Sequence, residues 1–397
     1  MRGIKIGSAL GIPIRLNWTF LLVLPLFAYL ISRDVGGIAM VINQSLSAGI
    51  DAEALQAGSM PLVLGFVSAL GLFAGVLIHE FGHSVVALHY GYDIDSITLW
   101  LLGGMADFAE LPEDWKHEFQ IAVAGPIVSV GIGGVCYAVF RLARGFPAGY
   151  DPVVFVFGYL AVLNVVLAVF NMLPAFPMDG GRVLRALLAR NRPHAKATQR
   201  AAEVGKVFAF LLGIIGLVSN WFLILLAFFI YIAASGEAQQ TTLKAAFEDV
   251  TVADIMTPRE DLDVVAEEDT VAELVERMFQ ERHTGYPVLR NGDLVGIVTL
   301  EDARNVSEVE RDAYQVGDVM EQDVETITPD TNAMAALQRM QEHDVGRLVV
   351  VDDDGELVGL VSRTDLMTAF NIIQSSGQPA SIRERSFGGE RELIKSD

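Results

Sequence analysis

The sequence predicts a polytopic α-helical membrane protein with about six transmembrane helices, followed by a smaller α/β domain. Apolar residues make up 52% of the 397 residues and the mean hydropathy is +0.41, which is typical of several membrane spans. Residues 1–247 hold 15 acidic and 15 basic residues, whereas residues 248–397 hold 34 and 13. Residues 248–371 also repeat internally at a spacing of about 63 residues. The C-terminal part therefore carries the whole net charge of −21, and this acidity argues against nucleic-acid binding.

The first elements expected are a pair of short strands at the membrane surface, within residues Met1–Leu16. Isoleucines alternate with other residues there, which is the pattern of a half-buried strand. The last apolar block of the chain is too long for one span, and Ser219-Asn220 near its middle favours a hairpin of two short helices. Six spans result, with five as the alternative: Trp18–Ser32, Pro61–Tyr90, Phe119–Phe140, Pro152–Leu173 and two within Val207–Ala234.

Basic residues between the fourth and fifth spans predict the orientation. Seven arginines and lysines lie in residues 182–206, so this loop is expected in the cytoplasm. Counting back along the spans puts the N-terminus inside and the polar Asp34–Met60 loop outside. With six spans the acidic domain is cytoplasmic, in a multi-pass protein of the cell membrane. The single cysteine, Cys136, excludes an intrachain disulfide.

A short apolar segment, Ile97–Phe108, lies between the second and third spans. It is rich in strand-forming residues, is interrupted by Gly103-Gly104, and is too short to cross the bilayer as a helix. One interpretation is a hairpin or re-entrant segment that dips into the membrane and is covered by protein. The other is an amphipathic strand at the surface.

The segment His79-Glu80-Phe81-Gly82-His83 is the strongest candidate for a chemical site. Two histidines four residues apart lie on one face of a helix, so both rings can reach one metal ion. Glu80 beside them can take a proton from a water bound to that metal. Ionisable residues inside an apolar segment of this length are expensive in hydrocarbon and mark function.

Two residues compete to be the third metal ligand. His89 has the spacing of the extended motif HExxHxxGxxH, but Val86 replaces its glycine, and on a continuous helix His89 lies about 9 Å beyond His83. Asp179 is the better candidate, because it follows two prolines that end the fourth span, and a glycine pair after it lets the backbone approach closely. The alternative for Asp179 is a cap of the helix that follows it.

Three motifs in this order resemble the site-2 protease family of intramembrane zinc metalloproteases: HEFGH (79–83), AGP (124–126) and NMLPAFPMDGGR (171–182). The resemblance covers residues 1 to about 240. It implies that His79, His83 and Asp179 bind one Zn²⁺ ion and that Glu80 is the general base. It also implies that Asn171 and Asn164 line the substrate site. The substrate would be a single-span membrane protein, cut within or near its transmembrane segment.

The repeated C-terminal units resemble tandem cystathionine-β-synthase-type (CBS) domains. Each repeat is expected to run strand, helix, strand, strand, helix. That family often binds adenine nucleotides such as ATP or AMP and often forms homodimers. The resemblance implies that Thr299 and Ser362 meet phosphate at a helix start, and that Asp302 and Asp365 contact ribose hydroxyls. The alternative is that these four residues are ordinary helix caps.

The sequence thus divides into an intramembrane metalloprotease domain (1–247), two CBS repeats (248–310 and 311–372) and a polar tail (373–397). We expect regulated intramembrane proteolysis, in which nucleotide binding to the CBS pair could gate the membrane site. Two alternatives are a CBS-regulated transporter or channel and a metal-binding membrane scaffold without catalytic turnover.

Overall fold

The structure is a computed structural model that describes residues 3–100, 103–108, 112, 114–146 and 150–376. The chain divides into two compact units, Met1–Gln239 and Gln240–Asp397. The expected tail at 373–397 lies outside the described residues from residue 377 on.

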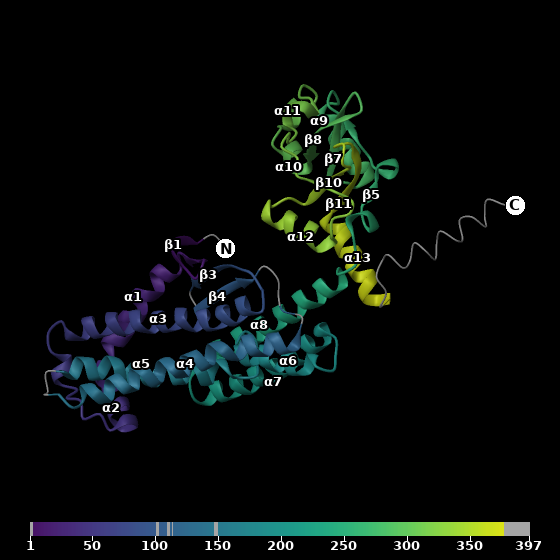
Figure 1. Cartoon of the computed structure of the whole chain (residues 1–397). Coiled ribbons are helices and arrows are strands. Elements are labelled where there is room, and N and C mark those ends of the chain that lie inside the picture. The colour runs from purple at the N-terminus through teal and green to yellow at the C-terminus, as the bar shows by residue number, and fades with distance from the viewer. Residues whose placement is uncertain (1–2, 101–102, 109–111, 113, 147–149, 377–397) are drawn as a thin grey trace. The chain divides into compact units, whose positions relative to one another are not determined.

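Helices make up most of the first unit. The helix α3 packs against α1 and α4, while α4 packs also against α5 and α6, and α6 against α7 (Figure 1). The largest apolar core lies between α2, α3, α4 and α5. The helices are α1 (Phe20–Arg33), α2 (Val35–Leu46), α3 (Met60–His89), α4 (Trp115–Ala143), α5 (Asp151–Asn171), α6 (Asp179–Ala189), α7 (His194–Val218) and α8 (Trp221–Ala246).

Five helices of the described residues are long and apolar enough to cross a membrane, namely α3, α4, α5, α7 and α8. A sixth span is possible if α1 and α2, which meet at a bend of 72°, count as one. The expected continuous span Trp18–Ser32 is therefore a 14-residue helix, shorter than the roughly 20 residues that a span needs. The prediction of a loop at Asp34–Met60 is wrong in part, because α2 occupies its first half.

The predicted break at Ser219-Asn220 is confirmed, since α7 ends at Val218 and α8 begins at Trp221. The two helices are longer than the short pair expected, with 25 and 26 residues. More polar segments on both sides, residues 194–206 and 235–246, continue the helices beyond the apolar block from which the prediction was made.

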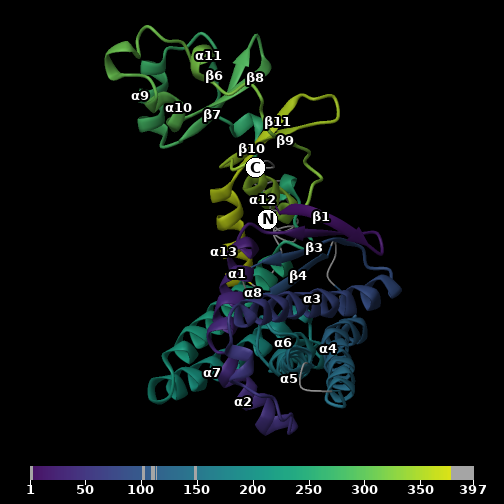
Figure 2. The same ribbon diagram turned by 90° about the vertical axis from the view of Figure 1, so that its left-hand side faces the viewer.

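A four-stranded sheet, in the order β1-β2-β3-β4, accompanies α3 (Figures 1 and 2). Its strands are β1 (Ile4–Ala9), β2 (Ile12–Leu16), β3 (Ile94–Trp100) and β4 (Gly103–Phe108). The predicted N-terminal strand pair is confirmed, and the apolar segment 97–108 belongs to the antiparallel hairpin β3–β4. Strand β2 runs parallel to β3, so the two hairpins form one sheet. Strand β4 is an edge of this sheet and packs against α3.

The second unit is an α/β structure made of two similar halves, as the sequence repeat predicts. The first half carries the sheet β6-β7-β8, and the second carries the sheet β5-β11-β10-β9. In each half a short strand pairs in parallel with the first strand of an antiparallel hairpin. Its elements are β5 (Thr257–Pro258), β6 (Val265–Ala266), α9 (Val271–Glu281), β7 (Gly285–Arg290), β8 (Asp293–Thr299), α10 (Leu300–Arg304), α11 (Val316–Val319), β9 (Thr326–Ile327), α12 (Ala333–Glu342), β10 (Arg347–Val351), β11 (Leu357–Ser362) and α13 (Arg363–Ser376).

The two halves are joined by exchange of a strand and by a polar contact. The strand β5 belongs to the first repeat in the sequence but pairs with β11 of the second. The guanidinium of Arg347 at the start of β10 donates to the carbonyl of Gly285 at 2.6 Å and to the hydroxyl of Thr284 at 2.8 Å. The second unit is therefore a single body rather than two independent repeats.

Candidate metal centre

Three side chains from α3 and the start of α6 meet in a buried cluster. His79, His83 and Asp179 are only 6%, 4% and 9% exposed. The two imidazole Nε2 atoms lie 3.1 Å apart. The carboxylate of Asp179 faces both, with Oδ2 3.2 Å from Nε2 of His79 and Oδ1 3.3 Å from Nε2 of His83. Residues 96 positions apart in the sequence thus bring three potential ligand atoms to one point.

The helix α4 orients both imidazoles from their other side. Nδ1 of His83 donates to the carbonyl of Ile121 at 2.6 Å, and Nδ1 of His79 lies 2.9 Å from Oγ of Ser129. Because a carbonyl only accepts, the neutral His83 ring must carry its proton on Nδ1 and present a lone pair at Nε2. Such outer hydrogen bonds fix the tautomer and direction of histidines that bind metals.

The cluster fits a zinc ion. Tetrahedral zinc with ligands at 2.0–2.1 Å puts neighbouring ligand atoms about 3.3 Å apart, which is close to the separations found. Oδ2 of Asp179 is buried and has no hydrogen-bond partner among the described residues, and Nε2 of His83 faces the carboxylate as a second acceptor. Acceptor atoms packed in this way repel each other unless a cation lies among them.

Gly125 on α4 keeps open the space in front of the Nε2 atoms of the two histidines. A Cβ atom there would collide with Nε2 of His83 and would lie 2.7 Å from Nε2 of His79. Any other residue would therefore occupy the position that both rings address. The AGP motif at 124–126 thus lies where α4 passes directly against the ligand atoms.

Asp179 is the first residue of α6, and its carboxylate does not cap that helix. The N-cap position belongs to Met178, whose side chain makes no cap hydrogen bond with the described residues. The chain reaches this point through a turn after Asn171, in which the backbone of Met172 and Leu173 packs directly on Gly180. A side chain at residue 180 would clash there, so the glycine after Asp179 permits the close approach that brings the carboxylate to the imidazoles.

The rival candidate His89 lies apart from the cluster. It is the last residue of α3 and is exposed, and its ring stands edge-on to Tyr90 at 5.4 Å between ring centroids. The structure thus follows the sequence argument, which removed His89 because Val86 leaves the helix uninterrupted.

Glu80 lines a cavity of about 300 Å³ together with the three clustered residues. Strand β4 forms one wall through residues 103–106. A Cβ atom at Gly104 would collide with Cγ of Glu80, so the edge strand runs directly against the glutamate. The cavity offers a carboxylate base beside the candidate metal ligands and, along one side, the edge of a sheet.

Both asparagines singled out in the sequence line this cavity. Asn164 on α5 is 1% exposed and donates through Nδ2 to the carbonyl of Leu160 at 2.8 Å. Its Oδ1 is buried and has no hydrogen-bond partner among the residues described. Asn171 is the last residue of α5 and is half-buried. Oδ1 of Asn164 is therefore available to a polar group that enters the cavity.

The four residues considered for nucleotide binding form two equivalent helix caps. Oδ2 of Asp302 accepts from the backbone N–H and hydroxyl of Thr299, at 2.8 and 2.7 Å. Oδ2 of Asp365 accepts from the same two groups of Ser362, also at 2.8 and 2.7 Å. The capping arrangement that the sequence analysis gave as the alternative is thus present at both positions.

One other group of potential metal ligands occurs among the described residues. Asp263, Glu281 and His283 offer ligand atoms close together at the surface of the second unit. Glu281 is already paired with Arg277 at 3.2 Å and with the hydroxyl of Tyr286 at 2.8 Å. An exposed group that holds an arginine does not have the unsatisfied acceptors of the cluster on α3 and α6.

Comparison with known proteins gives matches over both units. The model of Peptidase family M50 matches residues 67–149 and 147–214, and that of the CBS domain matches residues 252–308 and 316–372. A zinc metalloprotease of Methanocaldococcus jannaschii is 33% identical over 376 residues, which are 94% of this chain and 97% of that one. Rip3 of Mycobacterium tuberculosis is 31% identical over 389 residues, 93% of each chain. A solved site-2 protease from Methanocaldococcus jannaschii is 34% identical, with 60% of this chain and 95% of that chain covered and a TM-score of 0.41.

Proposed function

Since the chain belongs to the site-2 protease family of zinc metalloproteases, peptidase family M50, we propose that the cluster of His79, His83 and Asp179 is its zinc site. The protein is a membrane metalloendopeptidase with a pair of CBS domains. The observation that carries the proposal is the meeting of three buried side chains, whose Nε2 and carboxylate oxygen atoms lie 3.1–3.3 Å apart, at the wall of a cavity.

Glu80 is the proposed general base. His79, His83 and Asp179 would hold the zinc ion, which when bound would supply the Lewis acidity that activates a water molecule and a peptide carbonyl. Glu80 lies in the same cavity, takes the proton of the attacking water and delivers it to the leaving amine. Ile121 and Ser129 keep both imidazoles directed at the cluster throughout, through the hydrogen bonds on Nδ1.

The substrate is proposed to be a single-span membrane protein that enters the cavity in an extended form. A helical substrate has its carbonyls engaged in its own hydrogen bonds, so the span must unwind before a peptide bond can be attacked. Strand β4 offers a sheet edge along the cavity, where an extended segment can pair with it. The amide of Asn171 is placed to hold that segment or the oxyanion that develops during attack.

Metal analysis of the purified full chain tests the zinc site. We expect one zinc per chain in the wild type and loss of that zinc in His79→Ala and in Asp179→Ala. The matched control is His89→Ala, which removes an exposed histidine from the same helix and should keep the full zinc content. Zinc that persists in Asp179→Ala, or that disappears in His89→Ala, would contradict the assignment.

The proposed orientation has the N-terminus and the CBS pair in the cytoplasm. Its support is the cluster of seven basic residues in 182–206, between α5 and the apolar part of α7. A cysteine introduced into the β1–β2 turn of a Cys136→Ala chain should react with a membrane-impermeant maleimide only after the membrane of whole cells is opened. Labelling of intact cells would reverse the orientation.

The CBS pair is the proposed regulatory part, and it would gate cleavage through an adenine nucleotide. Both cap bonds of Asp302 and of Asp365 go to Oδ2, which leaves Oδ1 of each for ribose hydroxyls. We expect Asp302→Asn to weaken ATP or AMP binding by the full chain. Asp254→Asn is the control, because Asp254 caps Thr251 with the same pair of bonds outside the proposed site. Equal nucleotide affinity in both variants, or no binding by the wild type, would remove this proposal.

A homodimer through the CBS units is the proposed assembly. Two large apolar side chains of the first repeat are almost fully exposed, Phe279 on α9 at 87% and Val309 at 93%. Exposed apolar groups of this size outside the membrane segments mark contact surfaces. Phe279→Ser should halve the protein mass measured by light scattering in detergent, and an unchanged mass would contradict a dimer through this surface.

A further inference from the structure

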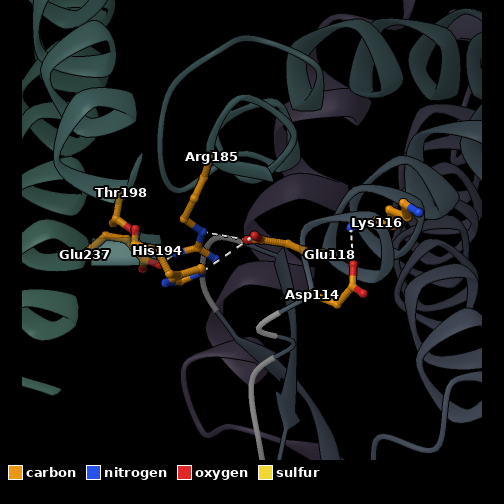
Figure 3. A network of polar contacts seen from close by, with 7 residues as sticks. All are labelled: Asp114, Lys116, Glu118, Arg185, His194, Thr198 and Glu237. Carbon is orange, nitrogen blue, oxygen red and sulfur yellow. Dashed lines mark hydrogen bonds and ion pairs between the residues drawn. The ribbon is translucent and has the colours of Figure 1, made fainter. Parts of the chain in front are cut away.

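A second buried polar cluster, formed by charged residues, joins four helices of the first unit. Arg185 on α6 is 3% exposed, and Glu118 on α4 is 5% exposed. Nε of Arg185 donates to Oε1 of Glu118 at 2.5 Å, and Nη1 of Arg185 donates to Glu237 on α8. His194, the first residue of α7, places Nε2 3.6 Å from Oε2 of Glu118. Figure 3 shows the side chains of Arg185 and His194 directed at the carboxylate of Glu118.

The geometry at Arg185 requires an arginine. Its planar guanidinium offers donors in different directions, so Nε can serve Glu118 while Nη1 serves Glu237. A lysine would bring one ammonium group in place of this fork. The guanidinium also lies over the ring of Phe176, 5.2 Å from the ring centroid. Buried charges are retained only where they are paired, so this arrangement holds the four helices together at one point.

The cluster includes α6, the helix that carries Asp179, and α4, the helix that orients both imidazoles. Arg185 follows Asp179 by six residues on α6, an unbroken helix of 11 residues. Glu118 precedes Ile121 by one turn on α4, and the carbonyl of Ile121 holds the ring of His83. The ion pair between Arg185 and Glu118 therefore ties the helix that carries the carboxylate to the helix that orients an imidazole. Phe176, beneath the guanidinium, belongs to the segment that leads into Asp179.

We propose that Arg185 is a positioning residue of the zinc site, which clamps α6 to α4 through Glu118 and thereby fixes Asp179 against His79 and His83. Glu237 extends the clamp to α8, and α8 continues to Ala246, beyond the boundary of the first unit. This inference rests on the proposed function, because it takes the three clustered residues as the zinc ligands. An arginine that only stabilised the fold would leave the zinc affinity of the folded chain unchanged.

The test measures zinc affinity in Arg185→Lys, with the full chain purified in detergent. We expect the zinc dissociation constant, from competition with a chromophoric chelator, to rise about 10- to 100-fold, as is usual for residues that support metal ligands. The absorption spectrum of the cobalt-substituted protein should change as well, since Asp179 would be displaced. On a reporter substrate, kcat should fall and KM should stay within about twofold. The control is Arg200→Lys, which alters an exposed arginine paired with Glu203 on α7 and should change none of these values.

A double variant, Glu118→Gln with Arg185→Gln, removes the ion pair without a change in net charge, and the carboxylate of Glu237 that loses its arginine is 31% exposed and so keeps contact with solvent. It should also fold, as judged by circular dichroism and gel filtration, and should also bind zinc more weakly. Wild-type zinc affinity and cobalt spectrum in both variants would overturn the inference. Loss of the folded chain in both would overturn it too, because we predict a folded chain with a weakened site. Failure of the proposed function is separate, since it shows as absence of zinc from the wild type or its retention in His79→Ala.

Discussion

The two units of the chain use similar polar side chains in opposite ways. In the first unit, polar atoms of His79, His83 and Asp179 meet from two helices distant in sequence, and Oδ2 of Asp179 has no hydrogen-bond partner among the described residues. In the second unit, Thr299 and Asp302 are three residues apart and satisfy each other at a helix start. Buried polar atoms that meet at one point without hydrogen-bond partners therefore indicate a bound ligand more strongly than the residue types alone do. A cap that is complete without a ligand gives no such indication.

The largest effect should come from filling the space in front of the first cluster. Gly125→Ala puts a methyl group against Nε2 of both histidines, so zinc should be lost and cleavage abolished. Gly131→Ala is the matched control, because it lies on the same helix and a Cβ atom there meets no described atom within 4 Å. Zinc content by atomic absorption and cleavage of a reporter substrate measure both. A Gly125→Ala enzyme with full zinc content would contradict the assignment of this cluster as the zinc site.

Glu80→Gln should separate the metal from the chemistry. The substitution keeps the shape of the side chain and removes the base, so turnover should fall by about 10²- to 10⁴-fold while the zinc content stays at one per chain. Glu203→Gln, on the exposed face of α7, should leave both values unchanged. Ordinary turnover by Glu80→Gln would remove the general-base role and leave a metal cluster with another function.

Asn171→Ala should have a smaller effect on the same reaction. Loss of one hydrogen bond to the substrate or to the oxyanion, worth about 1.4 kcal/mol, lowers kcat/KM by about tenfold. Asn191→Ala, in the exposed turn after α6, serves as the control. Unchanged kcat/KM in Asn171→Ala would leave Asn171 as a lining residue of the cavity without a part in cleavage.

The parts of this structure that could be predicted from sequence are those with local signals. The spacing of His79 and His83 places them on one helix face, and Ser219-Asn220 marks the turn between α7 and α8. The prolines and glycines around Asp179 indicate that the helix ends there and that the chain can turn back. The repeat in the second unit shows through alternating strands and turns, such as Asn291-Gly292, where both residues have positive φ.

Residue pairs that are distant in the sequence carry no such local signal, so their contacts could not be predicted. Nothing near Glu118 or Arg185 in the sequence indicates that they meet, since 67 residues separate them. Nothing in the sequence around Ser129 indicates a role for it, and only the structure shows its hydroxyl beside His79. The parallel pairing of β2 with β3 joins two hairpins that the sequence presents as unrelated. The bend of 72° between α1 and α2 also depends on packing and not on a local pattern.

The smallest effects should come from the helix caps of the second unit, which are complete without a ligand. Thr270 and Glu273 cap α9 with the same reciprocal bonds that Thr299 and Asp302 make at α10, but at a position with no proposed ligand. Thr270→Ala and Thr299→Ala should each lower the free energy of unfolding of this unit by about 1 kcal/mol, read from the denaturant midpoint of its unfolding transition.

The backbone N–H and hydroxyl of Thr270 hold the pKa of Glu273 below its ordinary value of 4.5. The part of the cap's contribution that comes from the hydroxyl bond to Glu273 is present above the unfolded pKa and is lost as the pH falls through the folded pKa, so the stability difference between the wild type and Thr270→Ala should narrow at acid pH. If added ATP raises the midpoint of the wild type and of Thr270→Ala but not of Thr299→Ala, the cap at α10 is also a ligand site. An equal response in all three proteins would leave it a cap alone.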